Sequence, residues 1–340
     1  MLSDSGLDGR RGRAVERRIR PAGLRLDSEI HPVATLALAA AGAGLLAFFA
    51  AGRSKRLGRG RADSAERAVT ASAAQRLNHA SSMLAASVLF DSGLEHYRGQ
   101  FFNRVMYTPI LVSSVTLAVS LHGAGDTDAG SSHVRHAVQA LAGLTGLGGF
   151  GFHLYNIGKR EGGYSFQNLF YAAPIGAPVA LTLAGILGVT AERVRDADPE
   201  RPRLAGLPAG RTLALATAAM LLGTTAEAGL LHFRGAFQNP AMFVPVTLPP
   251  VAAAVLVATA AEAPGTRRPG AAATLWAVSA MGILGVAFHA YGVARMMGGW
   301  SNWRQNLIDG PPLPAPPSFS GVALGGLAAI ELLERHRSSP

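Results

Sequence analysis

Long stretches without a charged residue limit what this chain can fold into. A membrane-spanning helix needs about 20 consecutive, predominantly apolar residues. Seven stretches at least that long contain no Asp, Glu, Lys or Arg, namely 30–52, 105–125, 136–158, 162–191, 235–261, 269–294 and 310–330. Charged residues make up only 15% of the chain, against roughly 25% of an ordinary soluble domain. The sequence therefore predicts an integral membrane protein rather than a soluble enzyme.

Two weaker segments complete the predicted set of helices. Residues 77–97 are interrupted by Asp91 and Glu95, and residues 212–233 by Glu227. Counting both gives nine candidate helices, of which the first lies at 33–52. No strand-like alternation of period two runs through these segments, so helices are favoured over a barrel. We predict an all-α, polytopic membrane protein of about nine transmembrane helices, with the lipid bilayer as its surroundings.

Composition excludes several kinds of chemistry. The chain has no Cys, which rules out disulfides, thiolate zinc sites, iron–sulfur clusters and a cysteine nucleophile. The net charge is +10, but Arg is concentrated at the N-terminus and between apolar segments. Because this charge does not follow one amphipathic face, we interpret it as the loop charge of a membrane protein and expect no nucleic-acid partner.

The second half of the chain repeats the first at a shift of 136 residues. Residues 93–109 align with 229–245, and nine of these 17 positions are identical. At the same shift, residues 152–155 (FHLY) align with 288–291 (FHAY). Each unit then contains four helices, and an even number returns the chain to its starting side. We therefore predict two parallel repeats related by an axis along the membrane normal.

The repeat and the charge distribution together divide the chain into segments. They are a basic, disordered N-terminal tail (1–32), an N-terminal hydrophobic helix (33–52), a basic linker (53–76), a first four-helix unit (77–191), a charged and exposed linker (192–210), a second four-helix unit (211–334) and a C-terminal tail (335–340). Within the first unit, Gly143, Gly146 and Gly149 predict a small-residue helix face that a neighbouring helix can approach closely.

Each of four predicted helical hairpins carries the same polar pattern. A His lies near the end of the first helix, an Asn follows in the loop, and a Pro lies six residues after the Asn. The four sets are His96, Asn103 and Pro109; His153, Asn168 and Pro174; His232, Asn239 and Pro245; and His289, Asn306 and Pro312. Since all four loops lie on the same side of the membrane, we expect the four His to share one layer near Asp91, Glu227, Arg98 and Arg234.

These residue types are typical of a cofactor site. Neutral imidazole is the commonest metal ligand and the usual ligand of haem iron, and carboxylates complete many metal sites in helical bundles. We therefore predict His96, His153, His232 and His289 as ligands of a haem or transition metal, joined in the metal case by Asp91 and Glu227. Arg98, Arg234, the four Asn and the aromatic pair Tyr155 and Tyr291 complete the predicted polar site.

A structural interpretation of the same residues stands beside the cofactor one. A His at a helix C-terminus can bond backbone carbonyls, Arg can pair with the nearby acids, Asn can satisfy loop carbonyls, and Pro fits the first turn of a helix. The spacing from His to Asn also differs, being seven residues in two hairpins but 15 and 17 in the other two. The sequence names no catalytic residue and leaves open whether the protein is an enzyme.

Three functions fit the sequence. The leading hypothesis is a haem- or metal-binding redox subunit that uses the four-His layer. The second is a transporter or channel for a polar solute or ion at the repeat interface, and the third is a scaffold whose aromatic loops recruit a soluble redox or other protein partner. Basic segments on the side opposite the His loops favour a cell-membrane protein with those loops on the extracytoplasmic side.

Overall fold

The computed structural model describes residues 64–127, 130–172, 174–263 and 265–335 of the chain. The predicted N-terminal tail and the helix at 33–52 lie outside these residues, as does nearly all of the C-terminal tail. The described residues contain eight long helices, which are α2 (Ser64–Arg98), α3 (Thr108–Gly125), α4 (His133–Gly158), α6 (Gly176–Asp196), α7 (Ala209–Arg234), α8 (Val244–Ala261), α9 (Pro269–Ala294) and α11 (Pro317–Arg335). The predicted helical architecture is confirmed, since the described residues are nearly all in helices.

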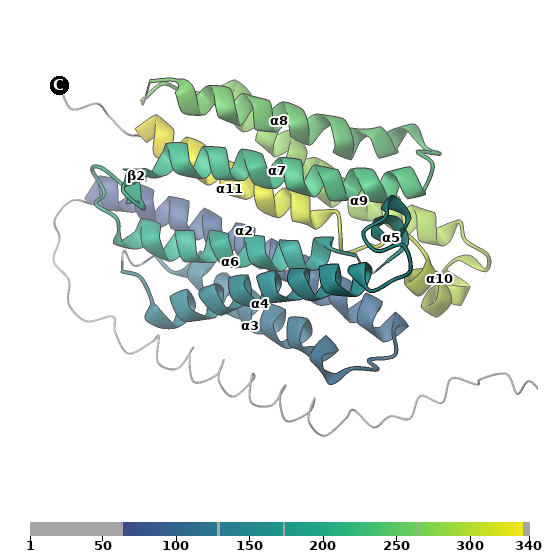
Figure 1. Cartoon of the computed structure of the whole chain (residues 1–340). Coiled ribbons are helices and arrows are strands. Elements are labelled where there is room, and N and C mark those ends of the chain that lie inside the picture. The colour runs from purple at the N-terminus through teal and green to yellow at the C-terminus, as the bar shows by residue number, and fades with distance from the viewer. Residues whose placement is uncertain (1–63, 128–129, 173, 264, 336–340) are drawn as a thin grey trace, which may run out of the picture.

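The eight helices lie lengthwise in one bundle, with the short helices α5 (Phe166–Tyr171) and α10 (Trp303–Asp309) at one end (Figure 1). Helices α2, α3, α4 and α6 pack in a ring in which each contacts the next, and α7, α8, α9 and α11 pack in the same order. The two rings join chiefly where α2 packs against α11, with a smaller contact between α6 and α7. The first and second units therefore form one molecule with α2 and α11 at its centre.

In the part of the chain that the structure describes, five helical segments are long and apolar enough to cross a membrane. They are Arg104–Gly125, Gly176–Asp196, Ala209–Arg234, Pro240–Ala261 and Pro269–Ala294. The first and fourth of these segments begin with the short 3₁₀ turns η2 (Arg104–Tyr107) and η3 (Pro240–Phe243), which precede α3 and α8. Large apolar side chains also face outward, among them Leu144 and Leu222, which are 67% and 52% exposed. These features are compatible with contact to a lipid bilayer.

Two predicted linkers are partly helical. Helix α2 begins at Ser64 rather than near residue 77, because residues 64–76 include five Ala and two Arg, which favour helices. Helix α6 continues to Asp196, and Glu192 and Arg195 are only 1% and 3% exposed. The prediction of an exposed linker from residue 192 is therefore wrong at its start. The remainder contains a two-stranded hairpin, β1 (Arg203–Leu204) and β2 (Leu207–Pro208).

The predicted small-residue face of α4 is confirmed. A Cβ added at Gly146 would lie 2.6 Å from the carbonyl oxygen of Pro178, and one added at Gly149 would lie 3.5 Å from Cβ of Pro178. Gly143 faces Gly185 of α6. Because only hydrogen occupies these positions, α4 and α6 approach closely along most of their length. This contact fixes the relative position of the two helices that carry the polar residues described below.

Candidate functional site

All four predicted His residues lie near the end of the first helix of a hairpin and bind the start of the next. Nδ1 of His96 lies 2.6 Å from the carbonyl oxygen of Met106, and Nδ1 of His153 lies 2.6 Å from that of Pro174. In the second unit the partners of His232 and His289 are the carbonyls of Met242 and Pro312, at 2.9 and 2.7 Å. Each imidazole therefore bridges the two arms of its own hairpin.

These hydrogen bonds determine which nitrogen of each neutral ring carries the proton. A carbonyl oxygen can only accept, so Nδ1 must carry the proton and Nε2 keeps its lone pair. A metal-binding His is usually held in this way through its other nitrogen. The bonds also have a purely structural value, since each satisfies a loop carbonyl at the point where the chain re-enters the bundle. A structural role therefore explains the Nδ1 hydrogen bonds of all four His without any cofactor.

The predicted four-His metal layer does not form a single centre. His96 lies within electrostatic range of His153, and His289 within range of His232, so the interactions between these rings occur inside each unit. Within the described part of the chain, no three side chains of His, Asp or Glu lie close enough together to hold a metal ion. The physical reason is that each His is turned toward a carbonyl of its own hairpin.

The predicted Asn residues shape the loops. Asn103 and Asn239 accept hydrogen bonds from the backbone N–H groups two residues later, at 3.0 and 2.9 Å, and so begin the turns η2 and η3. Asn168 and Asn306 instead donate to loop carbonyls, including those of Gly163 and Gly299 at 2.7 and 2.8 Å. The four Asn therefore stabilise loop conformation, as the structural interpretation predicts for the latter two.

Aligned loop positions in the two units share an unusual backbone conformation. Gln100 and Phe101 have φ of 59° and 46°, and Ala236 and Phe237, which occupy the aligned positions, have φ of 54° and 46°. Residues other than Gly rarely adopt positive φ, and the strain costs on the order of 1–3 kcal/mol at each position. The hydrogen bonds made by His96 and His232 to the same loops help to offset this strain.

The other predicted polar residues lie at the surface of this end. Tyr155 and Tyr291 are each 58% exposed, and Lys159 and Arg295 lie over their rings rather than over the His. Arg98 and Arg234 reach across to the other unit. Arg98 Nη1 lies 3.5 Å from the Ile308 carbonyl in α10, and the Arg234 guanidinium lies 5.8 Å from the centre of the Phe170 ring in α5.

Carboxylates of α2 and α7 interact where the two units meet at the same end. Asp91 of α2 interacts electrostatically with Glu95 on its own helix and with Glu227 of α7. Asp91 and Glu227 occupy equivalent positions, exactly 136 residues apart. Glu227 accepts a hydrogen bond from the N–H of Gly176, the first residue of α6. Among the described residues, no donor binds the Asp91 carboxylate.

The opposite end of the first unit contains a buried ionic network that the sequence analysis missed. Arg135 Nε and Nη2 donate to Glu192 at 2.7 and 3.1 Å, and Arg135 Nη1 donates to Asp126 at 2.7 Å. The Arg195 guanidinium donates to the carbonyls of Gly123 and Asp126 at 2.6 and 3.0 Å. Arg135 and Glu192 are both 1% exposed, so this network belongs to the core of the protein.

A chain of uncharged polar groups extends the network toward the middle of the bundle. Gln139 donates to the Ser120 hydroxyl at 2.7 Å and accepts from the Ser81 hydroxyl at 3.2 Å. The Ser81 hydroxyl also lies 2.9 Å from the carbonyl of Ala184. Gln139, Ser120 and Ser81 are fully buried. Side chains from α2, α3, α4 and α6 are therefore connected by polar contacts inside the first unit.

The second unit has leucine or isoleucine at four of the corresponding positions, although Ser81 corresponds to the buried Thr217. At the repeat shift Gln139 corresponds to Leu275 and Ser120 to Leu256, and both leucines are buried. After the two-residue insertion Glu192 and Arg195 correspond to Ile330 and Leu333, which are each 3% exposed. Comparison of the two halves position by position is the sequence signal that identifies the polar network.

No protein-family model, curated protein or solved structure matches this chain. The fold and the two polar ends define the protein as a helical bundle with membrane-compatible helices.

Proposed function

We propose that the protein is a polytopic membrane transport protein in which the junction between two parallel repeats carries a proton or a small cation. In this proposal α2, α4, α11 and residues 33–52 cross the membrane together with the five apolar segments. The His loops face the extracytoplasmic side of the cell membrane. Parallel units that share one order of helix packing support the arrangement, because ion sites often lie at the interface between repeats.

The observation that carries the proposal is the junction of Asp91 with Glu227. Ionisable groups at membrane depth are costly and suggest function. Two carboxylates that interact in a medium of low dielectric constant repel each other unless they share a proton or a cation. Glu227 has the Gly176 N–H as a partner, whereas Asp91 has no described donor, so Asp91 is the group that gains most from binding a cation.

Movement between the units gives the site a way to release its cation. The carboxylates come from different units, so a small displacement of α2 relative to α7 changes their separation and hence the affinity of the pair. Arg98 and Arg234 contact α10 and α5 of the opposite unit, and they couple the position of each unit to the loops at this end. His96 and His232, which lie five residues after the acids, extend a polar path toward the surface.

Proton flux into liposomes tests this proposal. We expect the purified protein in proteoliposomes to dissipate an imposed pH gradient faster than empty liposomes do. The variants Asp91→Asn and Glu227→Gln should slow this flux about tenfold or more, which corresponds to a barrier change of about 1.4 kcal/mol or more. Glu161→Gln is the matched control, since Glu161 is an exposed acid at the same end of the bundle.

Two results would contradict the proposal. One is the absence of proton or alkali-cation flux with the wild-type protein. The other is flux that Asp91→Asn and Glu227→Gln leave unchanged, because the carriers of the cation would then lie elsewhere.

A second candidate function is favoured by the hydrogen bonds of the four His. With Nδ1 bound to a carbonyl, each ring has an Nε2 suited to iron, and the pairs His96 with His153 and His232 with His289 each supply two imidazoles to one four-helix unit. Bundle cores commonly hold cofactors between facing helices. We accordingly retain a membrane redox subunit with a haem or metal as the alternative to cation transport.

An absorption spectrum with metal analysis of the detergent-purified protein separates the two candidates. A Soret band or stoichiometric metal that His96→Ala and His232→Ala abolish would favour the redox function. His133→Ala is the control, because His133 is exposed at the opposite end. A colourless, metal-free protein that conducts protons would leave cation transport as the function.

A further inference from the structure

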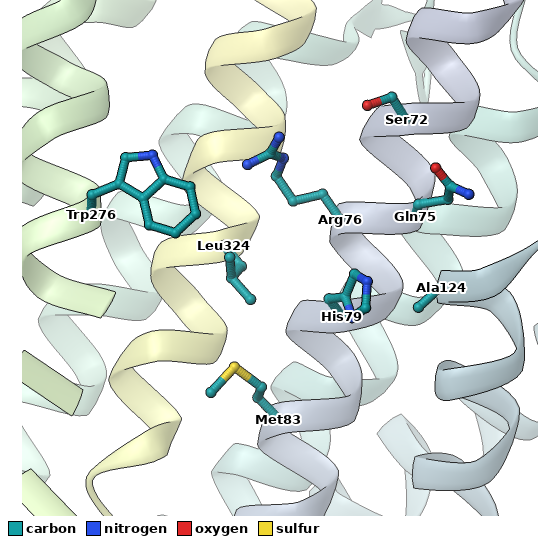
Figure 2. Close-up of a pocket in the computed structure, with 8 residues that line it drawn as sticks. All are labelled: Ser72, Gln75, Arg76, His79, Met83, Ala124, Trp276 and Leu324. Atoms are coloured by element: carbon teal, nitrogen blue, oxygen red, sulfur yellow. The ribbon is translucent and has the colours of Figure 1, made fainter. Parts of the chain in front are cut away.

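A groove on the side of the bundle lies apart from the proposed cation site. It has a volume of about 370 Å³ and is formed by α2, α3, α9 and α11 at the junction of the two units. Figure 2 shows Arg76, His79 and Met83 following one another along α2, with Trp276 of α9 on the far side and Leu324 of α11 between them. His79 and Trp276 are exposed, so the groove opens on the outer surface of the molecule.

The polarity of the groove changes along its length. Ser72, Gln75 and Arg76 line one end, His79 follows one turn later, and Met83 lies at the other end beyond Leu324 (Figure 2). The polar end is level with the end of α3, because Gln75 Nε2 donates to the carbonyl of Asp126 at 3.1 Å. A ligand that fits this groove has a polar group near the end of the helices and an apolar part toward their middle.

Arg76 is held so that its charge is available at the polar end. Its Nε lies 3.5 Å from a carboxylate oxygen of Glu331 in α11, and its side chain is 31% exposed. In Figure 2 the guanidinium lies beside α11 on the groove side of α2. A guanidinium has five donors, so one contact to a carboxylate leaves others for an anionic oxygen. Trp276 has the apolar body and polar N–H typical of side chains at the membrane interface.

The sequence immediately before α2 is basic, which favours an anionic partner for this part of the protein. Residues 53–61 contain five basic residues and no acidic one, and α2 begins at Ser64. Basic clusters next to a membrane helix attract anionic lipids through their surface potential. A volume of about 370 Å³ is at the lower end of the range for ligand sites, roughly 300–1,000 Å³. It therefore suits a headgroup with the upper part of its chains rather than a whole lipid.

We propose that this groove binds an anionic phospholipid, with Arg76 at the phosphate, Trp276 beside the glycerol region and Met83 along an acyl chain. The site is independent of the Asp91 and Glu227 junction, which lies at the opposite end of α2. Because α2 and α11 form the main contact between the units, a lipid bound across α2, α9 and α11 stabilises their relative position.

Native mass spectrometry and thermal unfolding of the delipidated full-length protein test the site. The probes are phosphatidylglycerol, phosphatidylcholine and inorganic phosphate. We expect phosphatidylglycerol to bind about fivefold more tightly than phosphatidylcholine, the effect of one basic side chain at an anionic headgroup. It should also raise the unfolding temperature, whereas inorganic phosphate at the same concentration should not.

Two variants remove the site in different ways. Arg76→Gln removes the charge, and Ser72→Trp fills the polar end while leaving the pair of Arg76 and Glu331 in place. Both should lose the preference for phosphatidylglycerol, and Arg160→Gln, at an exposed Arg of the opposite end, should keep it.

Equal binding of the two lipids by the wild-type protein would overturn the proposal, as would undiminished preference in both variants. An unfolding shift with inorganic phosphate equal to that with phosphatidylglycerol would also overturn it, because the groove would then be a site for a soluble phosphate.

Discussion

The buried ionic network of the first unit gives the sharpest prediction for stability. In Glu192→Gln the shape of the side chain is kept, but the charge opposite Arg135 is lost and an amide NH₂ faces donors. Three hydrogen bonds end on the Glu192 carboxylate, two from Arg135 and one from the N–H of Ser132 at 2.7 Å. Breaking a buried ion pair by removing one partner costs about 3–5 kcal/mol.

The lower end of that range is expected here, because Arg135 keeps its contact with Asp126 at 2.7 Å. In a protein of this size, each kcal/mol of lost unfolding free energy lowers the unfolding temperature by about 2 °C. A loss of about 3 kcal/mol therefore lowers it by about 6 °C. Circular dichroism of the detergent-solubilised protein measures this temperature. Glu200→Gln, at an exposed acid of the linker, should leave it unchanged.

Gln139→Leu is the matched test within the same core. It introduces the residue that the second unit has at this position, Leu275, and the Ser81 hydroxyl keeps contacts with Ser120 and Ala184 at 3.0 and 2.9 Å. The expected change is within about 1 kcal/mol, since a similar volume is retained and the remaining polar groups stay paired. A loss from Glu192→Gln no larger than that from Gln139→Leu would refute the assigned role of the ionic network.

Further predictions use the same unfolding measurement. Gly185→Val should prevent close approach of α6 to α4 and lower stability by at least about 3 kcal/mol, as overpacking at a backbone contact does; a neutral result would contradict the packing. His153→Phe should cost about 1 kcal/mol by leaving the Pro174 carbonyl without its donor, and an unchanged unfolding temperature would remove its bridging role. Asp91→Asn should raise stability, by on the order of 1 kcal/mol, because it removes the cost of burying this carboxylate and its repulsion with Glu95 and Glu227; a decrease would mean that the Asp91 charge is paired.

Much of the fold is predictable from sequence because it depends on patterns that the chain carries locally. Uncharged stretches locate most of the long helices, and the repeat identifies the segment around residues 77–97 as a helix despite Asp91 and Glu95. Helix N-terminal Pro109 and Pro245 lie in the first turns of α3 and α8, as predicted. That α2, α4, α11 and residues 33–52 also cross a membrane stays a prediction.

The site was harder to predict because the type of a residue does not determine where its side chain points. Four His in equivalent hairpins suggest a shared layer, but each ring turns to a carbonyl of its own loop, which depends on how the chain re-enters the bundle. Conversely, the charges of Glu192 and Arg195 suggest a solvated linker, although α6 carries both into the core. Pairing partners 57 residues apart, such as Arg135 and Glu192, are visible only once helices are placed side by side.

The polar core of the first unit bears on how the chain is assembled during synthesis. Arg135 is made before Glu192, so the hairpin of α3 and α4 exists for a time with only Asp126 to neutralise this cation. Its charges become fully paired when α6 arrives beside α4. In the second unit Leu275 and Ile330 occupy the corresponding places, and the buried Arg268 pairs with Glu262, which precedes it in the chain. Completion of the polar core in the first half of this protein therefore depends on the addition of its fourth helix.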